Sequence, residues 1–151
     1  MKVGFATHDL RSVNAGFHDA NFFLIYDVDA LRTECVRSIP INDDWEDGNM
    51  AAIDGRVEAV RDCAILCMRY FEEPSTARLV GARVNPVVVS GQDCRIQAVL
   101  RRLQVELRGK APPWLKKIYA ASNPPPFRSN VVYLPVRLQA TTSAQSGCSV
   151  S

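Results

Sequence analysis

The chain has 151 residues, of which 47% are hydrophobic and 23% charged, and this composition predicts one globular domain with an apolar core. A net charge of +2 and a pI of about 8.3 are too weak to indicate nucleic acid or a membrane as a partner. Because the chain has no apolar run of about 18 residues and no signal-like N-terminus, we expect a cytoplasmic protein.

The first part of the chain predicts a strand, a loop and a hairpin. Residues 2–7 alternate apolar with small or polar side chains and lead into a stretch rich in turn-forming residues, 8–20. Residues 22–29 and 31–39 are rich in β-branched and aromatic side chains and are separated by a short junction. A β-hairpin is therefore expected over residues 22–39.

The second part predicts helices and strands in alternation. After an acidic segment, 42–49, a helix is predicted from Met50, with Asn49 as its N-cap. A strand over 63–68, a short helix over 74–80 and a buried strand over 86–89 are predicted next. The last predicted element is an amphipathic helix from Asp93 onward with a basic outer face. The strand over 63–68 is a continuous apolar run, typical of a strand covered on both faces, so we expect it to be the central strand.

This order of elements predicts an α/β domain of three layers, in which a mixed five-stranded sheet is flanked by helices. The domain is expected to span residues 1–118. Residues 119–151 include a proline-rich segment and a polar end, and they show no periodicity that would close an element. We therefore expect a disordered C-terminal tail there.

Both histidines of the chain lie in the predicted loop 8–20. Sheets of this class present ligand-binding groups in loops at strand ends, and a neutral imidazole can coordinate a soft or borderline metal. His18 is therefore the first candidate metal ligand and His8 the second. The alternative is that both are solvated turn residues, because two histidines without a carboxylate-rich motif do not define a metal site.

The five cysteines include no CxxC pair, so reduced thiols are expected rather than a disulfide framework. Cys63 and Cys67 lie in the apolar run and are expected to be inert core residues, with coordination as the alternative. Cys94, at a predicted helix start, is a candidate reactive thiol. No role is assigned to Cys35 or Cys148.

A nuclease is the enzymatic alternative that the acidic residues raise. Asp9, Asp27 and Asp62 each lie near a predicted strand end, as a two-metal nuclease would require. Such an enzyme needs carboxylates within the first strand, where Val3 and Phe5 stand instead. The chain also lacks a glycine-rich phosphate loop and a nucleophile elbow, so no enzymatic activity is expected.

Six blocks of the sequence, in order, resemble the nitrogenase iron-molybdenum cofactor-binding family, which includes NifX, NafY and the C-terminal domain of NifB. The blocks are KVGFATHD, VNAGFHDANFFLIYDV, RVEAVRDCAILC, TARLV, NPVVV and LQVELRGKAPPWLKK. The resemblance covers residues 1–118 and is to NifX-like members. It implies a ribonuclease-H-like domain without catalysis that binds the iron-molybdenum cofactor or its iron-sulfur precursor. The implied partners are nitrogenase cofactor assembly proteins or apo-nitrogenase, with no nucleic acid and no membrane.

The resemblance also implies a cofactor loop within residues 13–20. His18 is its predicted ligand. The other residues expected to shape the site or attract the cluster are Asn14, Gly16, Phe17 and Arg11. Arg78, in the short predicted helix, is a further candidate for attracting an anionic cluster.

Two departures from the family pattern affect this expectation. The family loop typically places histidine before phenylalanine and glycine after it, whereas this chain has Gly16-Phe17-His18. The family usually carries a Gly-Gly turn before the short helix, whereas this chain has Glu72 and Glu73, which would repel an anionic cluster. The alternative to a carrier is therefore a diverged protein-interaction module that docks a nitrogenase component through its basic helix face without binding cofactor.

Overall fold

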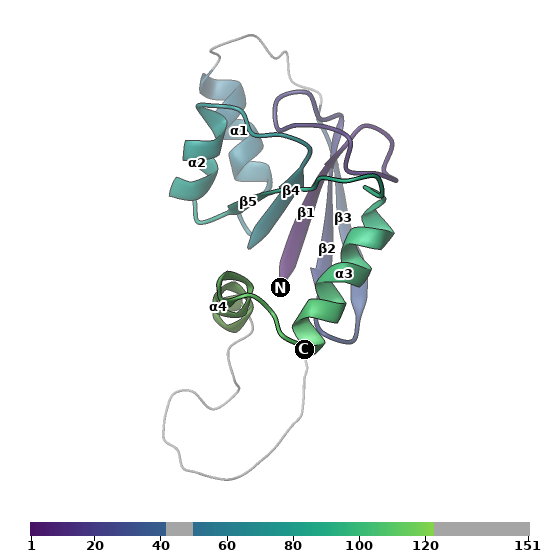
Figure 1. Cartoon of the computed structure of the whole chain (residues 1–151). Helices are drawn as coiled ribbons and strands as arrows, with labels where there is room; N and C mark the ends of the chain where they lie inside the picture. The colour runs from purple at the N-terminus through teal and green to yellow at the C-terminus, as the bar shows by residue number, and fades with distance from the viewer. Residues whose placement is uncertain (42–49, 123–151) are drawn as a thin grey trace.

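The computed structural model describes residues 1–41 and 50–122 (Figure 1). The acidic segment 42–49, with the predicted N-cap Asn49, lies outside the described residues. The elements in chain order are β1 (Lys2–Thr7), β2 (Phe22–Val28), β3 (Thr33–Pro40), α1 (Met50–Ala59), β4 (Ile65–Met68), α2 (Ser75–Gly81), β5 (Asn85–Val88), α3 (Ile96–Arg108) and α4 (Pro113–Ser122).

The five strands form one mixed sheet in the order β3-β2-β1-β4-β5. Strand β2 pairs antiparallel with both β1 and β3, which confirms the predicted hairpin. Strands β1, β4 and β5 are parallel. The predicted α/β fold with a mixed five-stranded sheet is confirmed, and this strand order is compatible with a ribonuclease-H-like topology.

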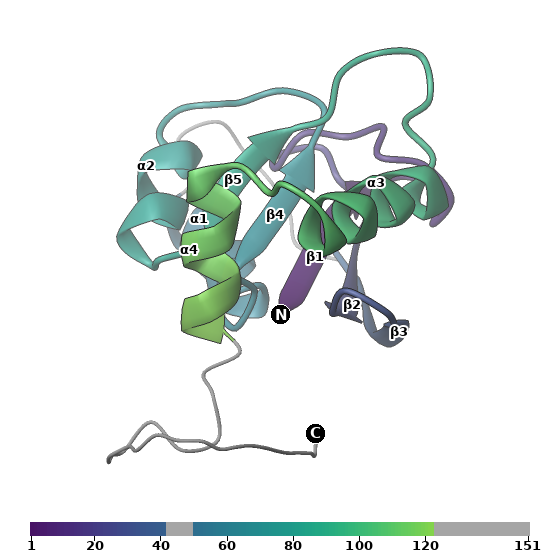
Figure 2. The ribbon, with the colours of Figure 1, turned by 60° about the horizontal axis from the view of Figure 1, so that its bottom comes forward.

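Helices cover both faces of the sheet, with α1 and α2 on one side and α3 on the other (Figures 1 and 2). Successive strand residues point to opposite faces, so each strand contributes to two cores. On one face, Phe5 and Cys67 pack with Leu100 of α3 and Leu115 of α4. This core joins the two C-terminal helices to the sheet.

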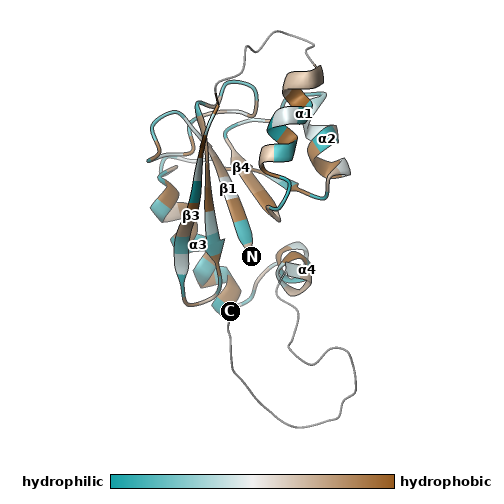
Figure 3. Cartoon of the chain, turned by 180° about the vertical axis from the view of Figure 1, so that it is seen from behind, coloured by the Kyte–Doolittle hydropathy of each residue, from teal (hydrophilic) through white to brown (hydrophobic). Residues whose placement is uncertain are grey.

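The second core lies on the opposite face. There Phe23 and Leu66 pack with Ile53 of α1 and Leu79 of α2, all fully buried or nearly so. Apolar residues accordingly run along β4, which lies between the two helical layers (Figure 3). No helix within residues 1–41 and 50–122 is long and apolar enough to cross a bilayer.

The structure corrects two predictions about the strands. The central strand is β1, not the apolar run that contains β4, because burial on both faces shows coverage by helices and not position within the sheet. Strand β5 is an edge strand with exposed ends and not a buried strand. Pro86 fits this place, since a residue without an N–H group is tolerated at a sheet edge.

Helix α4 was not predicted from the sequence. It begins at Pro113 and ends at Ser122, so it includes residues 119–122, which the sequence had assigned to the tail. Leu115 is fully buried against α3, while Ile118 and Tyr119 are partly buried in the same core. Residues 123–151, the rest of the predicted tail, lie outside the described part of the chain.

Candidate functional site

The β1–β2 loop, residues 8–21, lies at one end of the sheet beside the start of α3 (Figure 1). Backbone hydrogen bonds join it to two distant segments. The amide of Val13 donates to the carbonyl of Cys94, before α3, at 2.8 Å, and the amide of Arg69, after β4, donates to the carbonyl of Ala15 at 3.0 Å. The loop is therefore fixed to the sheet and to a helix start.

The first turn of this loop is organised by Asp9 and Asn14. The Asp9 carboxylate accepts hydrogen bonds from the amides of Arg11 at 2.9 Å and Ser12 at 3.0 Å, and these donors lower the pKa of Asp9. The Asn14 side-chain oxygen accepts from the amide of His8 at 2.8 Å. Asn14 thus supports the loop backbone, while the Arg11 side chain is exposed beside it.

Phe17 belongs to the core beneath the loop. Its side chain is fully buried, and its ring stacks on that of Phe23 with the centroids 5.5 Å apart. This packing fixes the backbone on either side of Phe17. Phe17 therefore shapes the loop from below and does not line its outer surface.

His18 is held by a single carboxylate from another part of the chain. Its backbone amide donates to Oε1 of Glu72 at 3.0 Å, and its Nδ1 lies 3.2 Å from Oε2 of the same side chain. The two side chains are 19% and 25% exposed, and Nε2 of His18 is buried. A metal or cluster could reach an imidazole nitrogen of His18 only after Glu72 or the loop moves.

Arg56, on α1, supports the same peptide groups from inside the protein. Its Nη1 donates to the carbonyl oxygens of Phe17 at 2.8 Å and His18 at 2.7 Å, and the residue is only 5% exposed. The sequence reasoning missed Arg56. A signal existed, because Arg56 lies on the apolar stripe of α1 between Ile53 and Val57, where a charged residue needs a buried partner.

Gly16 leaves space that other side chains occupy. A Cβ atom at position 16 would lie 2.5 Å from Cε2 of Tyr70 and 2.8 Å from Oε1 of Glu72. The Asp19 carboxylate joins these groups, because it accepts from the Gly16 amide at 2.7 Å and from the Tyr70 hydroxyl at 2.6 Å. This second bond raises the pKa of Tyr70 to about 12.

The two departures from the family pattern therefore meet in space. Position 16 has no side chain where the family carries histidine, and Glu72 stands where the family usually has a glycine turn. Glu72 lies against both Gly16 and His18, although 54 positions separate it from His18 in the chain. The exchange of glycine and histidine and the acidic turn form one packing arrangement.

The two histidines do not converge on a common point in the contacts observed. His8 Nε2 lies 3.7 Å from Oδ2 of Asp19, whereas His18 is paired with Glu72. Within the described ranges, no group of three or more His, Cys, Asp or Glu side chains is arranged to hold a metal ion. The described loop residues therefore do not supply a three-ligand metal site by themselves.

The remaining predicted electrostatic and thiol candidates have other surroundings. Arg78 forms an ion pair with Asp54 of α1. Cys63 and Cys67 are both buried in the core, as predicted, and this burial raises the pKa of their thiols to about 12. Cys94 Sγ lies 2.6 Å from Nη1 of Arg69. Cys35 is exposed and Cys148 lies outside the described residues.

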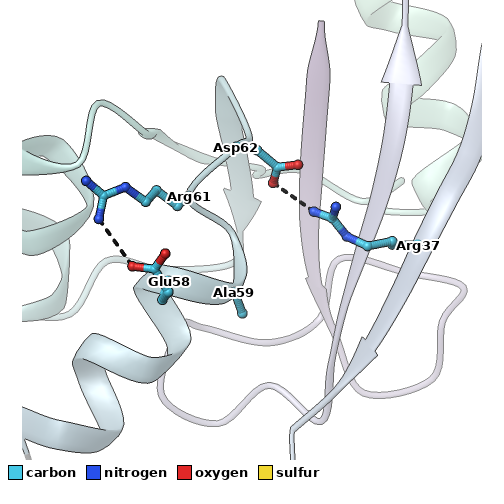
Figure 4. Close-up of a pocket in the computed structure, with 5 residues that line it drawn as sticks. All are labelled: Arg37, Glu58, Ala59, Arg61 and Asp62. Atoms are coloured by element: carbon cyan, nitrogen blue, oxygen red, sulfur yellow. Dashed lines mark hydrogen bonds and ion pairs between the residues drawn. The ribbon is translucent and has the colours of Figure 1, made fainter.

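Of the three acids of the nuclease alternative, Asp9 lies at the opposite end of the sheet from the other two. Asp9 follows the end of β1, whereas Asp27 lies in β2 opposite Lys2, at the start of β1. Asp62 lines an open hollow and forms an ion pair with Arg37 at 2.7 Å (Figure 4). The other lining residues of the hollow are Glu58, Ala59 and Arg61. Within residues 1–41 and 50–122 these acids belong to no group of three or more side chains that could hold a metal ion.

Comparison with known families identifies the domain as one of the nitrogenase cofactor class. The model of the dinitrogenase iron-molybdenum cofactor family matches residues 1–106, and the chain belongs to that family. The match includes the whole β1–β2 loop and the loop-contacting residues described above. The family resemblance predicted from the sequence is confirmed.

Individual relatives identify the branch as NifX-like. The chain is 33% identical to protein NifX of Sinorhizobium fredii over 126 residues, which covers 80% of this chain and 78% of the relative. It is 27% identical to protein NifY of Klebsiella pneumoniae over 119 residues, 78% of this chain and 50% of the relative. The crystal structure of PH0822 shares the fold, with a TM-score of 0.55, 14% identity, and coverage of 70% of this chain and 91% of that one. These comparisons support a role in nitrogenase cofactor biosynthesis.

Proposed function

We propose that this protein is a non-enzymatic carrier that binds the iron-molybdenum cofactor or its iron-sulfur precursor and passes it to nitrogenase assembly proteins or apo-nitrogenase. The observation that carries the proposal is the family match over residues 1–106, which contains the β1–β2 loop with its supports. Transfer requires a site that holds an anionic cluster by few contacts, so that the cargo can be released. His18 is the proposed protein ligand.

Anaerobic binding of isolated iron-molybdenum cofactor tests this proposal. The protein is incubated with cofactor and separated by gel filtration, and co-eluting iron and visible absorbance are measured. Wild type is expected to gain both, and His18→Ala to lose most of the bound iron. His8→Ala is the matched comparison on the same loop. If His8→Ala keeps its bound iron and His18→Ala loses it, the ligand is His18. If His18→Ala keeps its iron and His8→Ala loses it, the ligand is His8. Absence of bound iron on the wild-type protein rejects a carrier role.

A second candidate function is a protein-interaction module that has kept the fold without binding cofactor. The observation that favours it is the closed loop, in which His18 Nε2 is buried and Glu72 occupies the other side of the ring. The outer face of α3 supplies exposed Arg101 and Arg102 for docking.

A pull-down with apo-nitrogenase, performed without cofactor, distinguishes the two functions. The module is expected to form a stable complex that His18→Ala leaves unchanged and that Arg101→Glu weakens. The carrier is expected to retain iron in the binding assay above. A complex that forms only when cofactor is supplied contradicts the module.

A further inference from the structure

The contacts of Glu72 show how the loop binds a carboxylate. The two oxygen atoms of this side chain face two nitrogen atoms of one residue: the His18 amide donates to Oε1 at 3.0 Å, and His18 Nδ1, a donor when it carries a proton, lies 3.2 Å from Oε2. Both side chains are mostly covered. Two donors that converge on two oxygen atoms match the planar geometry of a carboxylate group.

Arg56 strengthens one of these donors through the peptide group that they share. The amide of His18 and the carbonyl of Phe17 belong to the same peptide unit, and that carbonyl accepts from Arg56 Nη1 at 2.8 Å. A cationic donor on the oxygen polarises the peptide and makes its N–H a stronger donor, an effect that is larger in a buried environment. Arg56 also brings a buried positive charge to this part of the loop.

We propose that the His18 amide and imidazole, supported by Arg56, form a binding position for a carboxylate group of the cargo, and that Glu72 fills this position in the unloaded protein. Cargo carrying a carboxylate exchanges with the Glu72 side chain. The exchange moves Glu72 away from Gly16. In the unloaded protein, Oε1 of Glu72 lies 2.8 Å from the place that a Cβ atom at position 16 would occupy. The inference rests on the proposed function for the role of the loop, and it adds the chemical class of group that the loop recognises.

The proposed carboxylate-binding position explains why the acidic residue Glu72 is compatible with a loop that binds an anion. A fixed carboxylate next to the loop would repel anionic cargo if it stayed in place. A carboxylate that already occupies the donors instead keeps them satisfied, because buried polar groups without partners are costly. Glu73, the neighbouring acid, is exposed and serves as a matched control.

Acetate titration of the full-length chain tests the position without the cofactor. The shift of the ¹⁵N-labelled His18 amide is followed at constant ionic strength in wild type, Glu72→Ala and Glu73→Ala. In Glu72→Ala the His18 amide shift is expected to saturate at an acetate concentration about tenfold lower than in the other two proteins. The reason is that this variant lacks the Glu72 carboxylate, which competes with acetate for the same donors. Equal behaviour of all three proteins overturns the proposal, and so does an equal shift with chloride, which lacks paired oxygen atoms.

Glu72→Gln keeps the test decisive if the alanine variant does not fold. Its side-chain oxygen can still accept from the His18 amide, but it has no carboxylate charge, so acetate should shift the His18 amide at concentrations between those of Glu72→Ala and wild type. No shift in a folded Glu72→Gln rejects the proposal. If the protein binds iron but not acetate, the carboxylate-binding position is rejected and the carrier function stands. If it binds acetate but not iron, the carrier function is rejected and the carboxylate-binding position stands.

Discussion

Glycine at position 16 leaves room that Tyr70 and Glu72 use. The nearest ring atom of Tyr70 would be 2.5 Å from a Cβ there, well inside van der Waals contact. The Tyr70 ring cannot move freely, because its hydroxyl donates to Asp19 at 2.6 Å. A methyl group at position 16 therefore has to displace a hydrogen-bonded side chain.

Gly16→Ala is expected to lower the free energy of unfolding by about 1–2 kcal/mol through this overpacking. Urea denaturation with a tryptophan signal would measure the change. Gly55→Ala is the control, because a Cβ at Gly55 meets nothing within 4 Å in the exposed middle of α1. The control is expected to be neutral or stabilising by up to about 1 kcal/mol. Equal effects of the two substitutions would contradict the crowding at Gly16.

Tyr70 offers a pH-dependent test of the same contacts. The bond from its hydroxyl to Asp19 raises the pKa of Tyr70 to about 12, so the folded protein favours the neutral phenol. This contribution to stability is present below the ordinary tyrosine pKa of about 10 and is lost as the pH rises toward 12. Asp19→Asn should return the pKa of Tyr70 toward its ordinary value, as followed by the NMR shift of its ring carbon. Tyr26 and Tyr119, whose pKa values are raised mainly by burial, should not move.

At the scale of elements, α1 supports the β1–β2 loop through one buried side chain. Arg56→Met preserves much of the side-chain volume but leaves the carbonyls of Phe17 and His18 without this donor. The expected loss of unfolding free energy is about 2–4 kcal/mol. Arg61→Met, at an exposed arginine paired with Glu58, should change it by about 0.5 kcal/mol or less. Thermal unfolding of both variants would show whether Arg56 carries this role.

Helix α4 is the element that the sequence reasoning missed, and its packing can be tested. Leu115 is fully buried in the core shared with α3, whereas the neighbouring Trp114 is 46% exposed. Leu115→Ala should cost about 2–4 kcal/mol of unfolding free energy. Trp114→Ala should lower the free energy of unfolding clearly less than Leu115→Ala does. If neither substitution affects denaturation, α4 does not contribute to the folded domain.

The local patterns predicted most elements but not their positions in the sheet. Alternation over residues 2–7 and the β-branched hairpin found three strands, and the spacing of apolar residues found α3. Proline suits the first turn of a helix, and Pro113 stands there in α4, which the predicted elements did not include. The apolar run with β4 revealed helices on both faces, but strand order depends on pairing that no local pattern contains.

The candidate loop was located by its turn residues and family resemblance, yet its chemistry depends on distant contacts. The partner of His18 lies 54 positions away, and Arg56 lies 38 positions away. The sequence showed that Gly16 and His18 are exchanged and that Glu72 is unusual. Only the fold shows that these differences touch one another.

At the scale of the whole molecule, one sheet joins two cores, and this arrangement predicts cooperative protection of thiols. Cys67 lies in the core on the α3 side and Cys63 in the core on the α1 side. Burial raises the pKa of both thiols to about 12, so neither should be alkylated at neutral pH without unfolding, whereas exposed Cys35 should react at once.

Alkylation followed by peptide mapping in increasing urea would measure this protection. Cys63 and Cys67 are expected to become reactive together, with the same midpoint as global unfolding. Labelling of Cys63 while Cys67 stays protected would show that the α1–α2 layer opens independently of the α3–α4 layer.

The packing of position 16 against positions 70 and 72 also limits the evolutionary routes by which such a loop can change. A histidine introduced at position 16 collides with Tyr70 and Glu72, whereas loss of Glu72 alone leaves the His18 donors without their carboxylate. Single substitutions therefore pass through a less stable intermediate, and the positions are expected to change as a group. Among homologous chains, bulky side chains at 70 and 72 should accompany glycine at 16, and small ones should accompany histidine there.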